Sequence, residues 1–382
     1  MSNRHLISRR QFLETSTATI SVTWLTSMVL FPSVASTNSN DIVAGAIRWD
    51  AWSKRADASI AAQHSLSSPR YYKRAPFYCS VAADSEISCI GTLAEMDEEI
   101  HAALKAGLKF WAFDWYPPDS SLRTAWTIYQ QSTNRMLINW CGLVGLNLLG
   151  SVPFSNNKWQ ANMREWAGYM RQTNYQKVNV EAPNRPLLYI LWNDNQLRFY
   201  FDNDLANLRK CIDYLSQLLI DTGLHAPYIV ILHGIAGVPI ARAVGGAISN
   251  YISRFKPETI GPYRDLDTQA RQFWKDMADT GEQIVPIAMV GWDTRARQER
   301  PVPWEHGTPN PNPNQYYVLA TPTELAAHLR AAVEFIHSHR AACPSKTLLI
   351  YSWDECDEGG GLIPTLGDPK GSYLSAIGPV IS

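Results

Sequence analysis

The feature that most constrains the fold of this 382-residue chain is a regular alternation of short apolar runs with amphipathic segments. Apolar runs of about four to eight residues are typical of buried strands, and apolar residues spaced three or four apart are typical of helices. Eight runs predict strands, at residues 42–49, 108–115, 135–141, 186–192, 228–232, 247–252, 284–290 and 347–351. Helical spacing separates most of them, at residues 92–106, 122–132, 158–172, 204–222, 267–280 and 323–339.

Capping signals support these helices. The segment 92–106 begins at Thr92, has Glu95 three residues later and ends before Gly107, a pattern typical of a capping box followed by a glycine stop. The acidic segment 202–204 is better explained as the N-cap of the next helix than as a metal site.

Strands that alternate with helices predict an α/β protein with parallel strands. With eight strands, we expect a single (β/α)8 TIM barrel with long βα loops, occupying residues 37–382 as one domain. An open doubly wound sheet is the alternative, but no G-x-G-x-x-G follows the first strand.

The first 36 residues are set apart as a targeting segment. S-R-R-Q-F-L at residues 8–13 is a twin-arginine pattern, followed by a moderately apolar stretch and a small-x-small site at 33–35. This predicts a bacterial Tat-type signal at residues 1–36 and a periplasmic or secreted protein. A membrane anchor is the competing interpretation, but Thr, Ser and Pro interrupt the stretch, and no later segment has about 18 uninterrupted apolar residues.

The amino-acid composition limits which kinds of ligand or macromolecule this chain is expected to bind. The formal net charge is −1 and no basic cluster interleaves with aromatic residues, so we expect no nucleic-acid partner. The 14 tryptophans and 17 tyrosines include rings that could stack on sugars, although most must be core. The six cysteines lack a C-x-x-C pair, so we expect no structural zinc, and we expect no cofactor. Cys79 and Cys89 are close enough in sequence for a disulfide in an export compartment.

Polar and aromatic residues recur where the predicted strands end, which is where barrel enzymes place their active sites. Each alone could be a satisfied residue closing a barrel layer, and His233 reads more simply as a hydrogen-bonded core residue. Together they are the candidate substrate-binding set: Asp50, Asp114, Trp115, Tyr116, Trp140, Trp192, Asn193, His233, Tyr251, Trp292, Asp293, Arg295 and Trp353.

The densest functional signal is W-D-E-C-D-E-G-G at residues 353–360, directly after the last predicted strand. Crowded like charges raise the pKa of at least one carboxyl group, and such a group can donate a proton near neutral pH. Glycosidases need one acid and one base, so Glu355 and Glu358 are the candidate catalytic pair. A solvated acidic loop and a calcium site are the alternatives, although the spacing of a calcium-binding helix-loop-helix is absent.

Three segments resemble the glycoside hydrolase family 99-like, or WbsX-like, barrels. Residues 93–116 are similar to an early helix-strand unit of that group, residues 291–295 (G-W-D-T-R) to its G-W-D-N-T-P-R segment, and residues 353–359 to its W-N-E-W-x-E-G motif. The similarity spans residues 42–366, and the last motif is the specific one. Asp354 stands where the motif has Asn, and Cys356 replaces its second Trp.

Family 99 enzymes are retaining endo-acting α-mannosidases and α-mannanases. The resemblance implies that Glu355 acts as a base toward the substrate 2-hydroxyl, whose oxygen then attacks the anomeric carbon to form an epoxide-like intermediate. It implies that Glu358 protonates the leaving oxygen and later activates water. We therefore expect an exported glycoside hydrolase acting on an α-linked oligo- or polysaccharide. A non-catalytic carbohydrate-binding barrel and a WbsX-like polysaccharide-pathway glycosyltransferase are the alternatives.

Overall fold

A computed structural model describes residues 41–382, apart from residues 153, 155–156, 256 and 306–313. The predicted signal at residues 1–36 lies outside the described residues. Within them, no helix combines the length and apolar character needed to cross a membrane.

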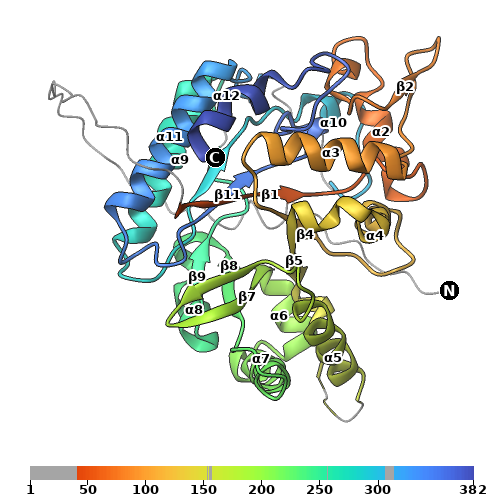
Figure 1. Ribbon diagram of the computed structural model, residues 1–382. Helices are drawn as coiled ribbons and strands as arrows, with labels where there is room; N and C mark the ends of the chain where they lie inside the picture. The colour runs from red at the N-terminus through yellow and green to blue at the C-terminus, as the bar shows by residue number, and fades with distance from the viewer. Residues whose placement is uncertain (1–40, 153, 155–156, 256, 306–313) are drawn as a thin grey trace, which may run out of the picture.

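Eight parallel strands form the centre of the molecule (Figure 1). Their order around the sheet is β10-β11-β1-β4-β5-β7-β8-β9. The ring closes where Ile248 N donates to Gln283 O at 2.9 Å and Val285 N donates to Ile248 O at 3.0 Å. The predicted (β/α)8 barrel is thus confirmed. The strands are β1 (Val43–Arg48), β4 (Phe110–Asp114), β5 (Asn139–Gly145), β7 (Ala182–Leu191), β8 (Tyr228–Leu232), β9 (Ala247–Ser249), β10 (Ile287–Met289) and β11 (Thr347–Tyr351).

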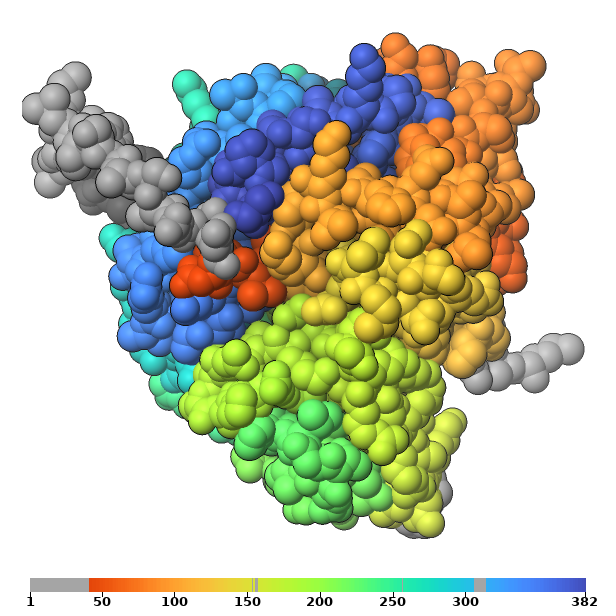
Figure 2. All heavy atoms as spheres, in the orientation of Figure 1, coloured from red at the N-terminus to blue at the C-terminus, as the bar shows by residue number. Residues whose placement is uncertain are grey.

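Helices surround the strands, and the six predicted ones are present with ends shifted by a few residues. At the start of α3, Thr92 and Glu95 form the expected capping box, and Asp204 caps α7 by accepting from Ala206 N. The space-filling view shows α3, α4 and α12 covering one side of the barrel (Figure 2). The helices are α2 (Ala58–Leu66), α3 (Leu93–Lys105), α4 (Thr124–Gln131), α5 (Lys158–Met170), α6 (Asp194–Phe201), α7 (Leu205–Ile220), α8 (Val238–Val244), α9 (Tyr263–Ala278), α10 (Arg295–Glu299), α11 (Pro322–Ser338) and α12 (Ser372–Ile381).

Two small antiparallel additions decorate the barrel. β2 (Ser80–Val81) and β3 (Ile87–Ser88) form a hairpin, and a disulfide between Cys79 and Cys89 joins its base, as the sequence suggested. β6 (Lys177–Val180) pairs antiparallel with the start of β7. That pairing explains why β7 begins earlier than its predicted residues 186–192.

The third predicted strand was placed too early. Residues 133–137 form a 3-10 turn instead of strand, because the Ser132 side chain accepts from Asn134 N and caps it. β5 therefore runs from 139 to 145, and Trp140 lies near its beginning rather than at its carboxyl end. β9 and β10 are also shorter than predicted, and Pro286, which has no N–H to donate, directly precedes β10.

Most aromatic residues belong to the core, as expected. Every described tryptophan is buried except Trp126, which is partly buried. The barrel interior is correspondingly tight. A Cβ added at Gly45 in β1 would overlap the Phe110 ring on the adjacent β4, so glycine is required there for space.

Gly45→Ala should lower the free energy of unfolding by about 1–3 kcal/mol, because the added methyl overpacks the barrel against Phe110. The matched control is Gly168→Ala in α5, where a Cβ would meet nothing within 4 Å. That control should gain up to about 1 kcal/mol from helix propensity. Urea unfolding of both variants checks the sign difference, and equal effects would contradict the packing argument.

Candidate active site

The acidic motif leaves the barrel at the carboxyl end of β11 and turns sharply. Residues 356–358 form a 3-10 turn, and Gly359 follows with φ 67°, a conformation that favours glycine. A Cβ at Gly359 would lie 3.2 Å from Asp293 Cβ, so the loop after β10 packs closely against this glycine. Ser352 Oγ accepts from Glu355 N at 2.7 Å and fixes the start of the turn. The backbone thereby aims successive acids in different directions.

Glu355 is fully buried beneath the carboxyl end of the barrel. The Tyr251 hydroxyl donates to Glu355 Oε1 at 2.6 Å, and Arg297 Nη2 lies 3.5 Å from Glu355 Oε2. Tyr251 follows β9, and Glu355 follows β11. Residues that are far apart in the sequence therefore meet at this carboxylate. Tyr251 was in the predicted set, whereas Arg297 was not.

Glu358 lies beside the same guanidinium. Arg297 Nη1 pairs with Glu358 Oε1, and the Tyr351 hydroxyl donates to Glu358 Oε2. The Glu358 side chain is 7% exposed, so it is the more accessible of the two glutamates. Burial raises the pKa of Tyr351 well above its usual value, with Glu355 and Glu358 adding to the effect. Tyr351 therefore remains a proton donor to Glu358.

Arg297 is the centre of this site. Its Nε donates to Asp357 Oδ2 at 2.7 Å and its Nη2 to Asp357 Oδ1 at 3.0 Å, a bidentate pair. Nη1 also reaches Glu305 Oε1 at 3.3 Å, and the guanidinium lies 5.2 Å from the Trp49 ring centroid. We call Arg297, Glu305, Glu355, Asp357 and Glu358 the Arg297 cluster.

The charges of this cluster do not balance. If Glu355, Asp357 and Glu358 were all ionised, the buried part of the cluster would hold two negative charges more than Arg297 neutralises. Excess charge without water is costly, so the arrangement favours retention of a shared proton. Burial raises the pKa of Asp357, although Arg297 opposes the shift. A site that holds both a proton and a carboxylate base can carry out acid–base chemistry.

A second buried cluster is centred on Arg48. Arg48 Nη1 is 2.9 Å from Glu99 Oε2, and Arg48 Nε is 3.5 Å from Asp50 Oδ2 and 3.9 Å from Asp354 Oδ2. We call these four residues the Arg48 cluster. Trp353 Nε1 donates to Glu99 Oε2 at 2.7 Å, so the predicted site residues Asp50 and Trp353 lie in this supporting layer.

The Arg48 cluster also has fewer cations than acids. Burial is the main reason why the pKa values of Asp50, Glu99 and Asp354 are all raised, and Arg48 offsets only part of it. Asp354 Oδ1 accepts from Trp49 N at 2.8 Å, and its carbonyl accepts from Trp52 Nε1 at 2.7 Å. Asp354 therefore ties the motif to the loop after β1.

These contacts show that the acids of the motif are not a solvated loop, because Asp354, Glu355, Asp357 and Glu358 are all buried. Their oxygens surround arginines. Within the described residues, no group of three or more His, Cys, Asp or Glu side chains is arranged to hold a metal ion.

Asp114 is the last residue of β4 and Tyr116 follows the strand, and both connect to the Arg297 cluster through Trp49. Tyr116 OH lies 3.4 Å from Asp114 Oδ2 and accepts from Trp49 Nε1 at 3.0 Å. The Trp49 ring in turn contacts the Trp304 ring edge-on, at a centroid distance of 5.7 Å. This aromatic wall brings β4 and β1 residues to the side of Arg297.

Trp115 and Trp140 do not reach the site. The two rings stack at 5.6 Å in the layer between strands and helices, where Trp115 also contacts Trp126 of α4 and Trp166 of α5. Trp140 Nε1 donates to Gln172 Oε1 at 3.0 Å. Trp115 and Trp140 were predicted to bind sugar at the ends of their strands. The structure instead places both rings against the surrounding helices, since their side chains point outward from the barrel.

Trp192, Asn193 and His233 lie together after β7 and β8. Trp192 Nε1 donates to Asp194 Oδ1 at 2.8 Å, and the Trp192 and His233 rings are 6.3 Å apart. Asn193 caps α6 by accepting from Gln196 N at 3.1 Å, which gives it a structural role. Burial lowers the pKa of His233, with a smaller opposing effect from Asp194.

The remaining predicted residues follow β10. The Arg254 guanidinium lies 3.5 Å from the Trp292 ring centroid. Arg295 binds Asp293 through Nε at 2.8 Å and Nη2 at 2.7 Å, and therefore does not enter the Arg297 cluster. Asp293 N donates to the Glu358 carbonyl at 2.6 Å, which places this pair against the acidic turn.

Arg297 was missed although a signal for it was present. Laid without gaps on G-W-D-N-T-P-R, residues 291–297 read G-W-D-T-R-A-R, so the seventh position is Arg297 and not Arg295. Tyr351 was missed because it looked like the last residue of a buried strand. Arg48 and Glu99 carried no signal, since each lies within a predicted strand or helix and becomes relevant only through packing.

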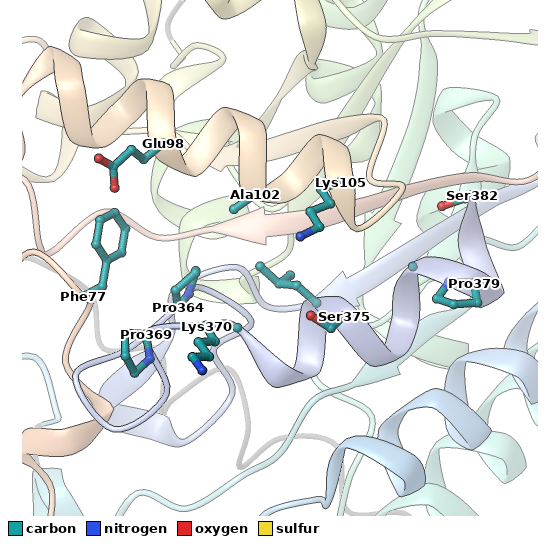
Figure 3. A pocket seen from close by; sticks show the side chains of 13 residues that line it. Phe77, Glu98, Ala102, Lys105, Pro364, Pro369, Lys370, Ser375, Pro379 and Ser382 are labelled. Atoms are coloured by element: carbon teal, nitrogen blue, oxygen red, sulfur yellow. The ribbon is translucent and has the colours of Figure 1, made fainter.

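A cavity of about 540 Å³ lies elsewhere, between α3 and α12 (Figure 3). Its lining includes Phe77, Glu98, Lys105 and Lys370 and no residue of the two arginine clusters.

No protein-family model matches the sequence, and no curated protein sequence matches it. Two solved structures of the family 99 endo-α-mannosidase of Bacteroides thetaiotaomicron are similar in fold. One, in complex with bis-tris propane, has a TM-score of 0.55 and 12% identity, and the match covers 91% of this chain and 97% of that one. The other has a TM-score of 0.51 and 12% identity, covering 91% and 96%. The shared feature is the (β/α)8 barrel.

Arg297→Gln should lower the free energy of unfolding by about 3–5 kcal/mol, because it leaves buried carboxylates without their cation. Arg297→Lys keeps the charge and should lose less. The exposed Arg330→Gln on α11 is the matched control and should change stability by less than about 0.5 kcal/mol. Urea unfolding at pH 7 is the measurement; similar values for the Gln variants at 297 and 330 would contradict the central role of Arg297.

Asp354→Asn should become progressively more stable than the natural chain as the pH rises. A carboxyl group whose folded pKa is raised contributes stability that is complete below its unfolded pKa and is lost as the pH rises through the folded pKa. The amide does not titrate and keeps an acceptor for Trp49 N. Urea unfolding at pH 5 and pH 8 should show a relative gain of roughly 1–3 kcal/mol. Parallel pH profiles would contradict it, and the exposed Glu334→Gln serves as control.

Proposed function

We propose that this chain is an exported glycoside hydrolase that cleaves an α-linked glycan. The observation that carries the proposal is the convergence of Glu355 and Glu358 on one buried guanidinium at the carboxyl end of β11. Active sites of (β/α)8 enzymes lie at that end, and the fold resembles that of an endo-α-mannosidase. The twin-arginine pattern supports export as part of the same proposal.

In the proposed mechanism, Glu355 accepts the proton of the substrate 2-hydroxyl as that oxygen attacks the anomeric carbon. Tyr251 supports this role because its 2.6 Å hydrogen bond orients the carboxylate. Glu358 donates a proton to the leaving oxygen and then takes one from the water that opens the epoxide-like intermediate. Glu355 returns its proton to the 2-oxygen in the same step, which restores the 2-hydroxyl and both carboxyl groups with overall retention. Tyr351 and Arg297 hold the Glu358 carboxylate from two directions.

Arg297 shapes how a sugar enters. Its side chain is fully buried, whereas its partner Glu305 is 20% exposed, and in the proposal the sugar approaches the glutamates past Glu305 and the adjacent Trp304. In the proposal, a sugar ring displaces these contacts and stacks against the Trp49–Trp304 wall. Arg297 then keeps Asp357 as its bidentate partner while the two glutamates turn to substrate.

A non-catalytic carbohydrate-binding barrel is the second candidate. The observation that favours it is that both glutamates are engaged by Arg297 and tyrosines and that Glu355 has no exposed surface. Such a protein would bind oligosaccharide without releasing reducing ends.

Glu355→Gln and Glu358→Gln should each reduce turnover by at least about 100-fold, because each removes one half of the acid–base pair. The natural chain and both variants are incubated with a panel of α- and β-linked polysaccharides. Released reducing ends are counted, and the anomeric configuration of the first product is read by NMR. Glu334→Gln, exposed on α11, is the matched control and should turn over normally.

Folding of each variant is checked by circular dichroism, so that loss of activity is separated from loss of structure. Normal turnover by either glutamine variant would refute the mechanism. Binding without product from any polysaccharide would instead favour the second candidate.

A further inference from the structure

Two arginines share one buried carboxylate beside the proposed catalytic turn. Arg295 binds both oxygens of Asp293, at 2.8 and 2.7 Å, and Arg74 pairs with Asp293 Oδ2 while its Nη1 donates to the Asp293 carbonyl at 3.2 Å. Burial alone would raise the pKa of Asp293, but the hydrogen bonds and charges of Arg295 and Arg74 outweigh it and lower the pKa. Asp293 is therefore an anion, and the three residues together hold one excess positive charge.

Tyrosine rings flank the two guanidinium groups. The Arg295 guanidinium lies 3.4 Å from the Tyr316 ring centroid and 5.9 Å from that of Tyr71, and Arg74 lies 4.9 Å from the Tyr71 ring. We call Tyr71, Arg74, Asp293, Arg295 and Tyr316 the Arg74–Arg295 site. Cations held against rings in this way are oriented before a ligand arrives.

Among the residues that the structure describes, the nearby acid Glu299 does not cancel the excess. Glu299 accepts from the Tyr71 hydroxyl at 3.0 Å, but it also pairs with Arg70 at 2.9 Å, so these two charges balance each other. The positive excess at Arg74 and Arg295 is local, because the whole chain has a net charge of −1.

The arginines retain accessible donors. Asp293 is 1% exposed, whereas the Arg295 and Arg74 side chains are 28% and 16% exposed. Among the described residues, the side-chain hydrogen bonds of Arg295 use Nε and Nη2, which leaves Nη1 for another acceptor. A planar guanidinium with aligned N–H groups binds carboxylate and sulfate oxygens better than neutral hydroxyls.

The site adjoins the proposed catalytic machinery. Asp293 N donates to the Glu358 carbonyl at 2.6 Å, and a Cβ at Gly359 would touch Asp293. A glycan with a sugar at the glutamates could therefore extend a neighbouring unit toward Arg74 and Arg295.

We propose that the Arg74–Arg295 site binds an anionic substituent, a carboxylate or a sulfate, on a sugar of the glycan. The natural substrate is then an acidic α-linked polysaccharide and not a neutral one. This inference rests on the proposed function for its biological setting, but the binding it describes does not require turnover.

Binding is measured by calorimetry with oligosaccharides of equal length that are neutral, carry uronic acid, or carry sulfate. The intact chain should bind at least one acidic series at least tenfold more tightly than the neutral one, and added salt should weaken that preference. The two acidic series distinguish a carboxylate from a sulfate ligand.

Arg295→Gln and Arg74→Gln should each reduce affinity for the acidic oligosaccharide at least tenfold and leave neutral binding unchanged. Each single variant keeps one arginine on Asp293, so the buried carboxylate stays paired and the fold is retained. Arg295→Lys should restore part of the preference, and Arg330→Gln is the matched control on α11.

Equal affinity of the intact chain for acidic and neutral oligosaccharides would overturn the inference. So would arginine variants that weaken both kinds of ligand equally. Failure of the proposed function is distinguishable, because Glu355→Gln should keep the acidic preference even where turnover is lost.

Discussion

The organisation of the site depends on one buried cation. Arg297 has no exposed side-chain surface, yet it contacts three carboxyl groups of a single turn and a fourth from the loop after α10. Removing a guanidinium from water is costly, and only this number of charged acceptors offsets the cost. Without Arg297, the turn at 355–358 could not hold its acids at one point, because their mutual repulsion would separate them.

The acidic motif is divided between two arginines. Asp354 points back to Arg48, whereas Glu355, Asp357 and Glu358 point to Arg297. The division follows from the backbone, which leaves the extended direction at Glu355 (φ −73°, ψ 61°) and enters the 3-10 turn at residues 356–358. The Arg48 cluster joins β1, α3 and the motif, and the Arg297 cluster joins the motif to α10 and the loop after it.

Both buried clusters contain more acids than cations, and this excess determines how they titrate. In both clusters the number of carboxyl groups exceeds the number of arginines, and the raised pKa values of Asp50, Glu99, Asp354 and Asp357 follow from burial. Buried carboxyl groups with raised pKa values keep their protons at a pH where exposed carboxyl groups have lost them. At the Arg74–Arg295 site the cations outnumber the acids, because Arg74 and Arg295 share the single carboxylate of Asp293. This contrast underlies the proposed preference for an acidic glycan.

The sequence alone determined the barrel and placed the acidic motif at the end of its last strand. Strand and helix periodicities are local properties, so six helices and the strands around β11 could be predicted from residue spacing, and Glu355 and Glu358 from the motif at the end of β11. The errors also have local causes. Ser132 caps a turn where strand was expected, and the resulting shift of β5 moved Trp140 away from the carboxyl end.

Only the tertiary structure decided which side chains meet. Tyr251, Arg297 and Tyr351 come from three different segments, and their contacts with the glutamates depend on how barrel closure orders β9, β10 and β11. The direction in which a side chain points also depends on neighbouring segments. Trp115 and Tyr116 are adjacent in sequence, but Trp115 packs against α4 and α5 whereas Tyr116 accepts from Trp49 beside the site. Residue spacing predicts where a strand ends, but the pleat of the strand and its neighbours determine which side chain faces the barrel mouth.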